Sequence, residues 1–398
     1  MVEKKIRHDY RQKMYYVRHF LPVTLVVSRN LPVYSLSAMH DRITQDSIAR
    51  ALGLSIKTVQ RAFSGSDKVA ESTKTSIQNY AAMVGYSRNR GARALVRNNL
   101  QSMHLFSSSS PEYFWSKVAR GMESALVETR DFGYAAFYHP IPPRNTAAYM
   151  KELQRASTEG LDAAAVVNNP EYDMGRIFGF LDHRRIPYIT LNIDATETQR
   201  LGFIGPDYGA GGRLAAEFIG KTIRSSSKVL IIHNPVDSEH ILAGAHVNEE
   251  RLLHFVSYLS VHFPYIEHQV VSFGSNQSRT DIEQELEDIL TGGADDFTGI
   301  YSIADMQELL GKQILRRGLE SRYIILVHGV TPETEMYLRS HAFTAAIHQN
   351  PFKQGYYAIK LLEYYLENGA APSTIPPVSQ GIVLGHSMDY EDDIWRFE

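Results

Sequence analysis

Residues 44–65, TQDSIARALGLSIKTVQRAFSG, predict two short helices near the N-terminal end of the chain. Thr44 is a suitable N-cap for a helix through Ala51, because its hydroxyl can accept a bond from a free N–H of the first turn. Gly53 ends that helix, and Ser55 is the N-cap of a second one. Two short helices joined by a three- or four-residue turn with glycine are typical of a helix-turn-helix.

The second helix of this pair is predicted to bury one face in the domain core and to expose its other faces. Val59 and Phe63 lie one turn apart and are expected to be buried. The positions expected to be exposed are Ile56, Lys57, Thr58, Gln60 and Arg61, and all of them but Ile56 are polar or cationic. Such side chains can reach base edges and phosphates in a major groove, and Gln suits an adenine edge. A small cationic bundle could equally bind a protein, and the pattern alone leaves that alternative open.

A third helix completes the expected bundle. We expect it to begin with Glu71 or Ser72 as its cap and to end at Val84. Tyr80 and Met83 are the candidates for its inner face. The sequence therefore predicts a small all-helical domain within residues 41–86.

Charge is distributed unevenly along the 398 residues. The net charge of −3 conceals a balance of +5 over residues 1–40, +6 over 41–100 and −14 over 101–398. A basic head on an acidic body suggests that the head meets a polyanion and the body does not. A solvated basic tail is the other explanation of the same balance.

Residues 44–65 closely resemble the DNA-binding head of the LacI/GalR family of transcriptional regulators. The matching positions are Ala49, Gly53, Ser55, Thr58, Val59, Arg61 and Gly65, followed by the runs 69–73 and 84–89. The resemblance implies that this region, including Thr44, contacts operator DNA. Gln60 stands where the family usually has Ser, so no operator sequence is carried over.

Residues 89–95, NRGARAL, resemble the hinge of the same family. In that family a short helix orders on DNA and its Leu enters a minor-groove step, and an apolar wedge of this kind kinks the duplex. Leu95 matches the wedge, and Asn89, Ala92 and Arg93 match its neighbours. We therefore expect a hinge over residues 87–100. An ordinary basic linker is the alternative.

Beyond the hinge, strands and helices alternate. The expected strands lie at about 103–106, 134–138, 161–167, 188–192, 229–233, 267–273, 299–302, 323–328 and 345–348, with helices between them. This order predicts an α/β fold of parallel sheets with helices on both faces. Residues 101–398 exceed one comfortable core, so we expect two lobes with a ligand pocket between them. The segment resembles the family's sensor, which is similar to periplasmic sugar-binding proteins.

Candidate ligand contacts follow the predicted strands or match family pocket positions. They are the aromatic residues Tyr113, Phe114 and Trp115, and the polar residues Asn192, Asp194, Asp207, Arg251, Asp305 and Gln349. Aromatic rings, an Arg and a carboxylate together suit a sugar or polyol. Two positions depart from the family's pocket motifs. His254 stands where the family has a Gly three residues after the Arg, and Ala304 stands where it usually has an Asn before the Asp that matches Asp305.

Residues 1–40 show no clear period, and we expect an N-terminal extension there, disordered or preceding a true start at Met39. Lys4, Lys5 and Arg7 precede the apolar run 20–27, which leaves a signal peptide as an alternative. The sequence has no Cys, which excludes disulfides and thiolate chemistry, and no hydrophobic run as long as a membrane span.

The sequence predicts a binding protein and not an enzyme. The glycine-rich run 205–212 lacks the lysine of a Walker loop and the spacing of a dinucleotide site. We expect no cofactor and no metal, a cytoplasmic homodimer or tetramer, a pseudo-palindromic operator and a sugar or polyol effector. A periplasmic-type sugar-binding protein without DNA binding, or an enzyme on the same fold, are the alternatives.

Overall fold

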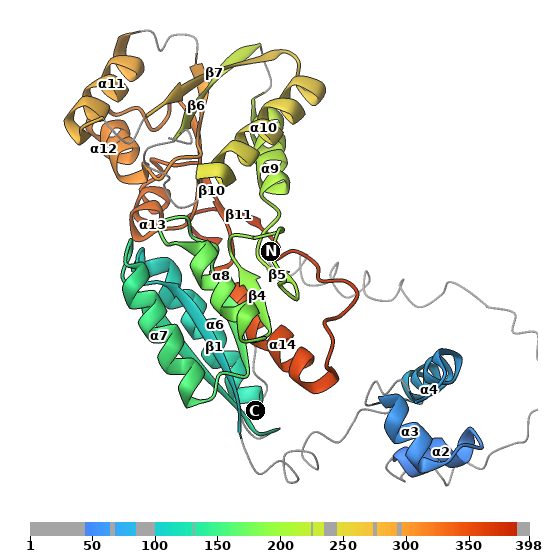
Figure 1. Cartoon of the computed structure of the whole chain (residues 1–398). Helices are drawn as coiled ribbons and strands as arrows, with labels where there is room; N and C mark the ends of the chain where they lie inside the picture. The colour runs from blue at the N-terminus through green and yellow to red at the C-terminus, as the bar shows by residue number, and fades with distance from the viewer. Residues whose placement is uncertain are drawn as a thin grey trace, which may run out of the picture.

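The computed structural model describes residues 44–63, 68–84, 100–129, 132–223, 226–234, 245–273, 277–292 and 297–387. It contains a three-helix head, residues 44–84, and a larger two-lobed body that begins at residue 100 (Figure 1). The predicted extension 1–40 and most of the hinge 87–100 lie outside the described residues.

The head consists of α2 (Gln45–Ala51), α3 (Ile56–Phe63) and α4 (Glu71–Met83). The Thr44 hydroxyl accepts a hydrogen bond from the Ser47 N–H at 3.2 Å, and the Ser55 hydroxyl accepts one from the Thr58 N–H at 3.1 Å. Both predicted N-caps are confirmed. They satisfy first-turn N–H groups that have no partner within their own helix.

The predicted core of the head is confirmed for Val59, which is fully buried, whereas Phe63 is only half-buried against the same core. On α4, Ile77 is fully buried. Met83 is 73% exposed, so its predicted inward position is wrong. Ala81 takes the inner place, and Met83 lies about 200° further around the helix. Glu71 is the first helical residue of α4, so neither predicted cap residue is the N-cap.

The first lobe is a parallel five-stranded sheet in the order β2-β1-β3-β4-β5. Its strands and helices are β1 (Gln101–Ser108), α6 (Glu112–Thr129), β2 (Tyr134–Ile141), α7 (Thr146–Glu159), β3 (Ala163–Val166), α8 (Met174–His183), β4 (Tyr188–Leu191) and β5 (Phe203–Ile204). α7 and α8 pack on one face, and α6 packs on the other together with a helix from the C-terminal part of the chain. The strand β3 is buried along its whole length, as expected for a sheet covered on both sides.

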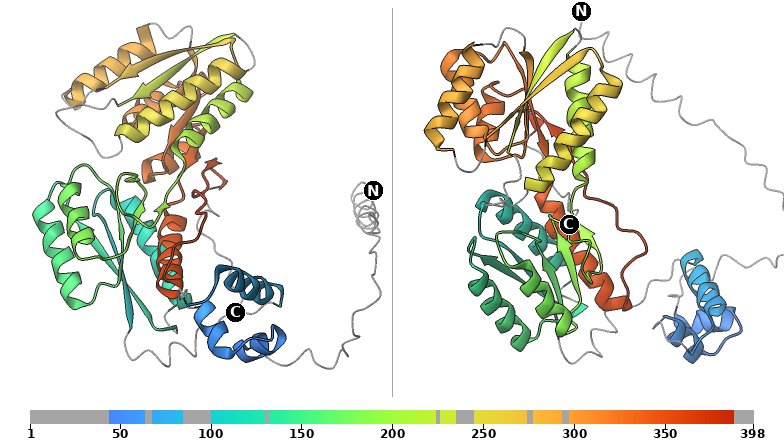
Figure 2. Two further views of the ribbon diagram at one scale, coloured as in Figure 1. Left: turned by 45° about the vertical axis from the view of Figure 1, so that its right-hand side comes forward. Right: turned by 45° about the horizontal axis from the view of Figure 1, so that its top comes forward.

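The second lobe is a six-stranded sheet in the order β11-β10-β9-β8-β6-β7. Its elements are α9 (Tyr208–Thr222), β6 (Ser227–His233), α10 (Ala245–His262), β7 (Ile266–Ser272), α11 (Arg279–Gly292), β8 (Phe297–Ser302), α12 (Gln307–Arg317), β9 (Ile324–His328), α13 (Pro332–Arg339), β10 (Ala345–His348) and β11 (Gly381–Val383). α9 and α10 cover one face, while α11, α12 and α13 cover the other. The predicted two-lobed α/β fold is therefore confirmed (Figure 2).

The chain crosses between the lobes three times. It enters the second lobe at α9, returns with α14 (Pro351–Asn368), and crosses again to form β11. α14 packs against α6 so closely that a Cβ added at Gly355 would lie 1.9 Å from the Val118 carbonyl oxygen. The helix–helix contact therefore fixes the C-terminal segment to the first lobe, and glycine is required at that point.

Candidate functional site: a cavity between the lobes

A cavity lies between the lobes at the carboxyl ends of the parallel strands. The space between its walls totals about 1050 Å³, a volume that includes open solvent at its mouth. Segments that follow β1, β3, β4, β8, β9 and β10 line it, together with α9 and α10. Seven of the nine predicted ligand contacts line this cavity: Tyr113, Phe114, Trp115, Asn192, Arg251, Asp305 and Gln349.

The aromatic side of the cavity is the start of α6. Tyr113 and Phe114 are half-buried, so their rings are available to a ligand face. Trp115 is 6% exposed and its indole N–H donates to the Ser110 carbonyl at 3.2 Å. Its ring also belongs to the core of the first lobe, so Trp115 contributes mainly to packing.

The cationic side of the cavity is Arg251 on α10. The guanidinium Nη1 donates to the Asn248 side-chain oxygen at 3.0 Å, and the guanidinium carbon lies 5.4 Å from the centre of the Tyr208 ring. Its Nε is buried without a hydrogen-bond partner among the described residues. Burial lowers the pKa of Arg251, because desolvation penalises the charged form.

Asp305 lines the same cavity as Arg251, and its side chain is exposed to solvent there. Desolvation raises the pKa of Asp305, and the Arg251 charge opposes that shift. A carboxylate there can accept hydrogen bonds from hydroxyl groups of a bound polyol.

Asn192 and Gln349 line the cavity, and Gln354 forms hydrogen bonds with both residues. Asn192 has a left-handed backbone (φ 62°), and its amide donates to the Gln354 side-chain oxygen at 3.1 Å. The Gln349 carbonyl oxygen accepts a bond from the Gln354 amide at 2.9 Å, which leaves the Gln349 side chain at the cavity wall. Buried Gln354 thereby connects the ends of β4 and β10 across the site.

Asp194 and Asp207 do not line the cavity, and the structure corrects their predicted position. The Asp194 carboxylate pairs with Arg200 at 2.6 Å and accepts a bond from the Thr190 hydroxyl at 2.6 Å. Asp207 is the N-cap of α9, where its carboxylate accepts the Ala210 N–H at 2.7 Å. Both carboxylates form hydrogen bonds or ion pairs with nearby residues of their own loop or helix. Their positions after predicted strands therefore did not indicate a ligand contact.

Several polar residues that line the cavity were not predicted from the sequence: Ser110, Lys117, Asn169, Tyr208, Asn248, His328 and His348. His328 and His348 are the last residues of β9 and β10. The rule that selected Asn192, a polar side chain at the carboxyl end of a strand, applies to them as well. His328 is 2% exposed, and neither ring nitrogen has a hydrogen-bond partner among the described residues.

His254 has a structural explanation. A Cβ at Gly209 would lie 2.5 Å from the His254 ring, so α9 has a glycine where the larger side chain packs. The His254 Nδ1 lies 3.2 Å from the Arg213 Nη1. The substitution of the family glycine is accommodated by a glycine on the facing helix.

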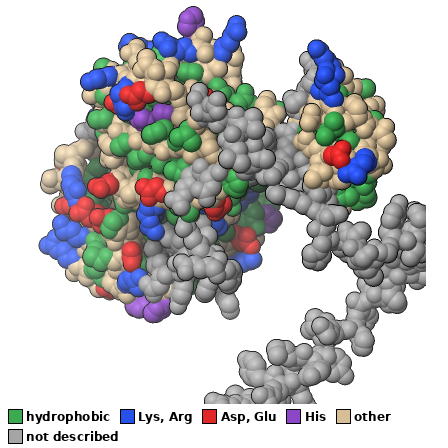
Figure 3. Space-filling view, turned by 90° about the horizontal axis from the view of Figure 1, so that it is seen from below, with side chains coloured by type: hydrophobic (Ala, Val, Ile, Leu, Met, Phe, Trp, Pro, Cys, Tyr) green, Lys and Arg blue, Asp and Glu red, His purple; other side chains and the backbone are tan. Residues whose placement is uncertain are grey.

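The predicted DNA-contacting residues of the head lie on and before α3. Ile56, Lys57 and Gln60 are exposed, and Thr58 and Arg61 are half-buried. Thr44 and Ser55 are exposed at the starts of their helices. Lys and Arg side chains are visible on the surface of the head (Figure 3). Asn89, Ala92, Arg93 and Leu95 lie outside the described residues.

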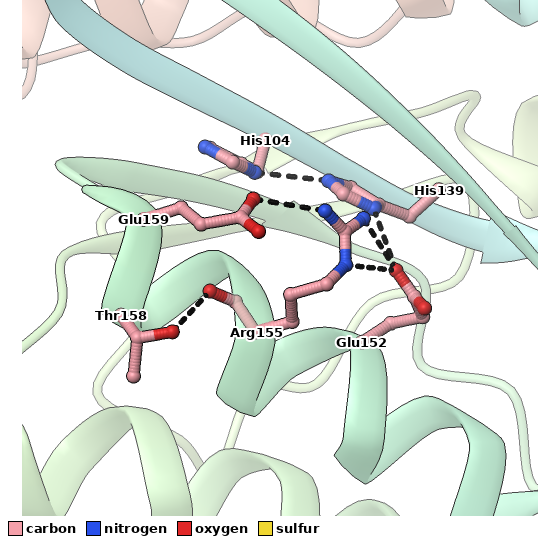
Figure 4. Close-up of polar contacts among 6 residues, drawn as sticks. All are labelled: His104, His139, Glu152, Arg155, Thr158 and Glu159. Carbon is pink, nitrogen blue, oxygen red and sulfur yellow. Dashed lines mark hydrogen bonds and ion pairs between the residues drawn. The ribbon is translucent and has the colours of Figure 1, made fainter.

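A second polar cluster lies in the first lobe and does not line the cavity (Figure 4). The His104 Nδ1 and His139 Nε2 are 2.9 Å apart and both rings are buried. Glu152 approaches the His139 Nδ1 at 3.6 Å, and Arg155 joins Glu152 to Glu159 on α7. Burial lowers the pKa of His104 to about 4, with the neighbouring charges as smaller causes.

The described part of the chain contains neither a metal-binding cluster nor a membrane-spanning helix. It holds no group of three or more His, Cys, Asp or Glu side chains arranged for a metal ion. None of its helices has the length and apolar composition needed to span a bilayer.

The class of protein is defined by these features: a two-lobed sensor fold with a cavity at its lobe interface, preceded by a helix-turn-helix. The family model described as "Periplasmic binding protein domain" matches residues 104–370, and the chain belongs to this family. The resemblance to LacI/GalR regulators is confirmed by the relatives described next.

The chain is similar to regulators and to one solved regulator structure. It is 23% identical over 282 residues to the HTH-type transcriptional regulator CelR of Thermobifida fusca, covering 69% of this chain and 77% of that protein. It is 25% identical over 181 residues to the HTH-type transcriptional repressor PurR of Serratia proteamaculans, covering 44% and 50%. A further curated HTH-type regulator is covered over only 26% of its length.

A crystal structure of a putative LacI transcriptional regulator from Bacteroides fragilis superposes with a TM-score of 0.62 at 18% identity. The match covers 74% of this chain and 99% of that one. At this identity the likeness establishes the fold and nothing finer.

Proposed function

We propose that the chain is a sequence-specific DNA-binding transcription regulator controlled by a small molecule bound between the sensor lobes. One observation supports this proposal most strongly: a single chain contains both a helix-turn-helix and a cavity between two lobes. Lys57 and Gln60 are exposed on the helix-turn-helix, and Arg251 and Asp305 line the cavity. Neither the matching family nor the relatives described above indicates catalysis.

On DNA, α3 enters the major groove. Lys57 and Arg61 pair with phosphates or guanine, and Gln60 reads an adenine edge. Thr44 and Ser55 bring the starts of α2 and α3 to the phosphate backbone. The hinge residues Asn89, Ala92, Arg93 and Leu95 order on the duplex, where Leu95 wedges the minor groove.

The regulator acts as a cytoplasmic homodimer, or a dimer of dimers, on a pseudo-palindromic operator. Two heads then read two half-sites one helical turn or a multiple of it apart. The printed functions of the relatives, a regulator and a repressor, support the same role for this chain, and we propose that it represses.

The effector is a sugar or polyol. Tyr113 and Phe114 stack on its C–H faces, Arg251 donates to it, and Asp305 accepts from its hydroxyls. Binding closes the lobes around the ligand, and that closure changes the order of the hinge. The three chain crossings between the lobes are the natural place for such a movement.

The DNA-binding half of the proposal is tested by selection from a random duplex pool and by a gel shift on the selected sequence and the gene's own upstream DNA. We expect a specific complex whose affinity falls steeply with salt. Lys57→Ala should weaken binding and lower the salt slope by about one. Lys151→Ala removes one exposed cation from the first lobe and should change neither quantity. A full-length protein that prefers no duplex would refute the proposal.

A further inference from the structure

Helix α10 contains an uncharged segment that is longer than in any other helix of the body. Residues 252–262, LLHFVSYLSVH, include no Asp, Glu, Lys or Arg. The longest such run in another helix of the body is 354–359 of α14. A helix with apolar residues all around its circumference is typical of a buried element, because a surface helix has polar and charged groups on its outer face.

The outer face of α10 is nevertheless exposed. Phe255 and Leu259 are fully buried against the second sheet, whereas Leu253 is 63% exposed and Val261 is 72% exposed. Ser257 lies between these two and is exposed as well. Leu253, Ser257 and Val261 follow one another at intervals of four residues, so they form one ridge along the helix. Two large aliphatic side chains in water on an uncharged helix indicate that something apolar covers this ridge.

The distribution of charge around the ridge favours a second copy of the chain. A two-fold axis places the residues near it against their own copies, so a charge there would face a like charge. The ridge has no charge near Ser257. Exposed Glu250 lies seven residues away, so in an antiparallel pair the two Glu250 carboxylates are about 20 Å apart, beyond the Debye length. A parallel pair would bring them together.

The opposite end of the ridge suits the acidic end. In the antiparallel pair, Glu250 of one copy approaches the last turn of α10 in the other, where His262 is exposed. Lys221 at the end of α9 is 69% exposed beside that turn, although it also pairs with Glu217 of its own helix. A nucleic acid is a poor match for the ridge, because a polyanion requires cations that residues 252–262 lack.

We propose that the outer face of α10 is an interface between two copies of this chain. The two helices cross antiparallel at Ser257, and Leu253 of each copy packs against Val261 of the other. This inference rests on the proposed function, which includes a homo-oligomer, and names the surface that joins its copies. A ridge of residues spaced by four packs well between the ridges of an identical helix, and a small residue at the crossing permits close approach. Charged residues are depleted at the centres of such interfaces.

Sedimentation velocity of the full-length protein, without DNA or sugar, tests the interface. Wild type should associate, and Leu253→Glu should raise the dissociation constant at least about a hundredfold, because it places a charge in an apolar contact. Met336→Glu is the matched control, since Met336 is 51% exposed on α13 at the opposite face of the same sheet. This variant should associate as wild type does. Thermal melts establish that both variants fold.

Two further variants test the antiparallel arrangement. Leu253→Glu combined with Val261→Lys should restore association, because each new carboxylate then faces a new ammonium group. The chain has no cysteine, so Ser257→Cys introduces a single thiol at the crossing point. Mild oxidation should link two copies through it, because helices in contact can bring facing Cα atoms within the span of a disulfide. Ser340→Cys, at an exposed serine after α13, should not be linked.

Several results would overturn the inference. The chain could be monomeric at every concentration, or Leu253→Glu could leave its association unchanged. Dissociation by Met336→Glu but not by Leu253→Glu would place the interface on the other face. A double variant that stays dissociated, or a linked Ser340→Cys with an unlinked Ser257→Cys, would contradict the antiparallel crossing. No operator is present in these measurements, so their failure leaves the DNA-binding proposal to its own test.

Discussion

At the scale of single residues, a position after a strand is not enough to identify a ligand contact. Asp305 and Asp207 both follow a strand in the sequence, yet only Asp305 lines the cavity, because Asp207 caps α9. Sequence alone predicted the two to be equivalent. Their difference depends on whether the carboxylate has a local N–H to accept, which is decided in three dimensions.

The two aspartates give a paired prediction. Asp305→Asn should weaken effector binding about tenfold or more, because the amide replaces one acceptor by a donor and removes the charge. Asp207→Asn should leave the affinity and the melting temperature nearly unchanged, since Asn is as good an N-cap as Asp. Trp115 fluorescence and thermal melts measure both. Equal losses in the two variants would contradict the placement of the site.

The buried pair His104 and His139 predicts an acid-sensitive first lobe. The folded-state pKa of His104 is about 4, below its ordinary 6.5, so the unfolded chain binds more protons between these values. The contribution of neutral His104 to the free energy of unfolding should therefore be fully present above pH 6.5. It should be lost as the pH falls from 6.5 toward 4. Burial lowers the pKa of His139 in the same direction.

Urea unfolding at pH 7.5 and pH 5 measures this effect. Wild type should lose stability at pH 5, and His104→Gln should lose less between the two values, even if it is less stable overall. Exposed His183 is the control, because His183→Gln should leave the pH difference intact. The same pH difference in wild type and in His104→Gln would contradict the account.

At the scale of elements, alternating strands and helices could be predicted because each buried strand is a short apolar run between turn residues. The strands β1 to β4 and β6 to β10 all lie where the sequence placed them. α13 and β11 were missed. α13 has 8 residues and β11 has 3, too few for a period to stand out.

The return of α14 to the first lobe was also beyond prediction from the sequence. An amphipathic pattern gives the buried face of a helix but not the sheet that it covers. The pairing is set by the small residues Gly121 and Gly355, which let α6 and α14 approach. Their mutual role is visible only once both helices are in place.

The helix contact gives a stability prediction. Gly355→Ala should destabilise the body by about 1–3 kcal/mol or more, because its Cβ would collide with backbone that cannot move aside. Gly179→Ala, in the middle of α8 with no atom within 4 Å of the new Cβ, should be neutral or stabilising. Denaturant melts compare the two. Equal stability of both variants would show that α6 and α14 are not in close contact.

The recognition helix gives a specificity prediction. Gln60→Ala should cost about 1–3 kcal/mol at one base position and relax the preference there, because a base-edge contact is lost. Selection from a random duplex pool, run in parallel with wild type, measures the change. A uniform loss across all sequences would assign Gln60 to the phosphate backbone instead.

At the scale of the whole molecule, the central claim is that the cavity and the head are coupled. The two sites lie in separate parts of one chain, joined by residues that match the family hinge. Coupling of two sites is a free energy, so it must act equally in both directions. The sign of the coupling, release or tightening of DNA, follows from which lobe arrangement the ligand prefers.

The most direct test is therefore a thermodynamic cycle on the full-length protein. Operator affinity is measured by fluorescence anisotropy with and without saturating effector, and effector affinity is measured with and without operator. The account predicts that both change by the same factor, of about 5 to 150, and that Asp305→Asn shifts the effector concentration required. Operator affinity that is the same at every effector concentration, for a protein shown to bind both, would contradict it.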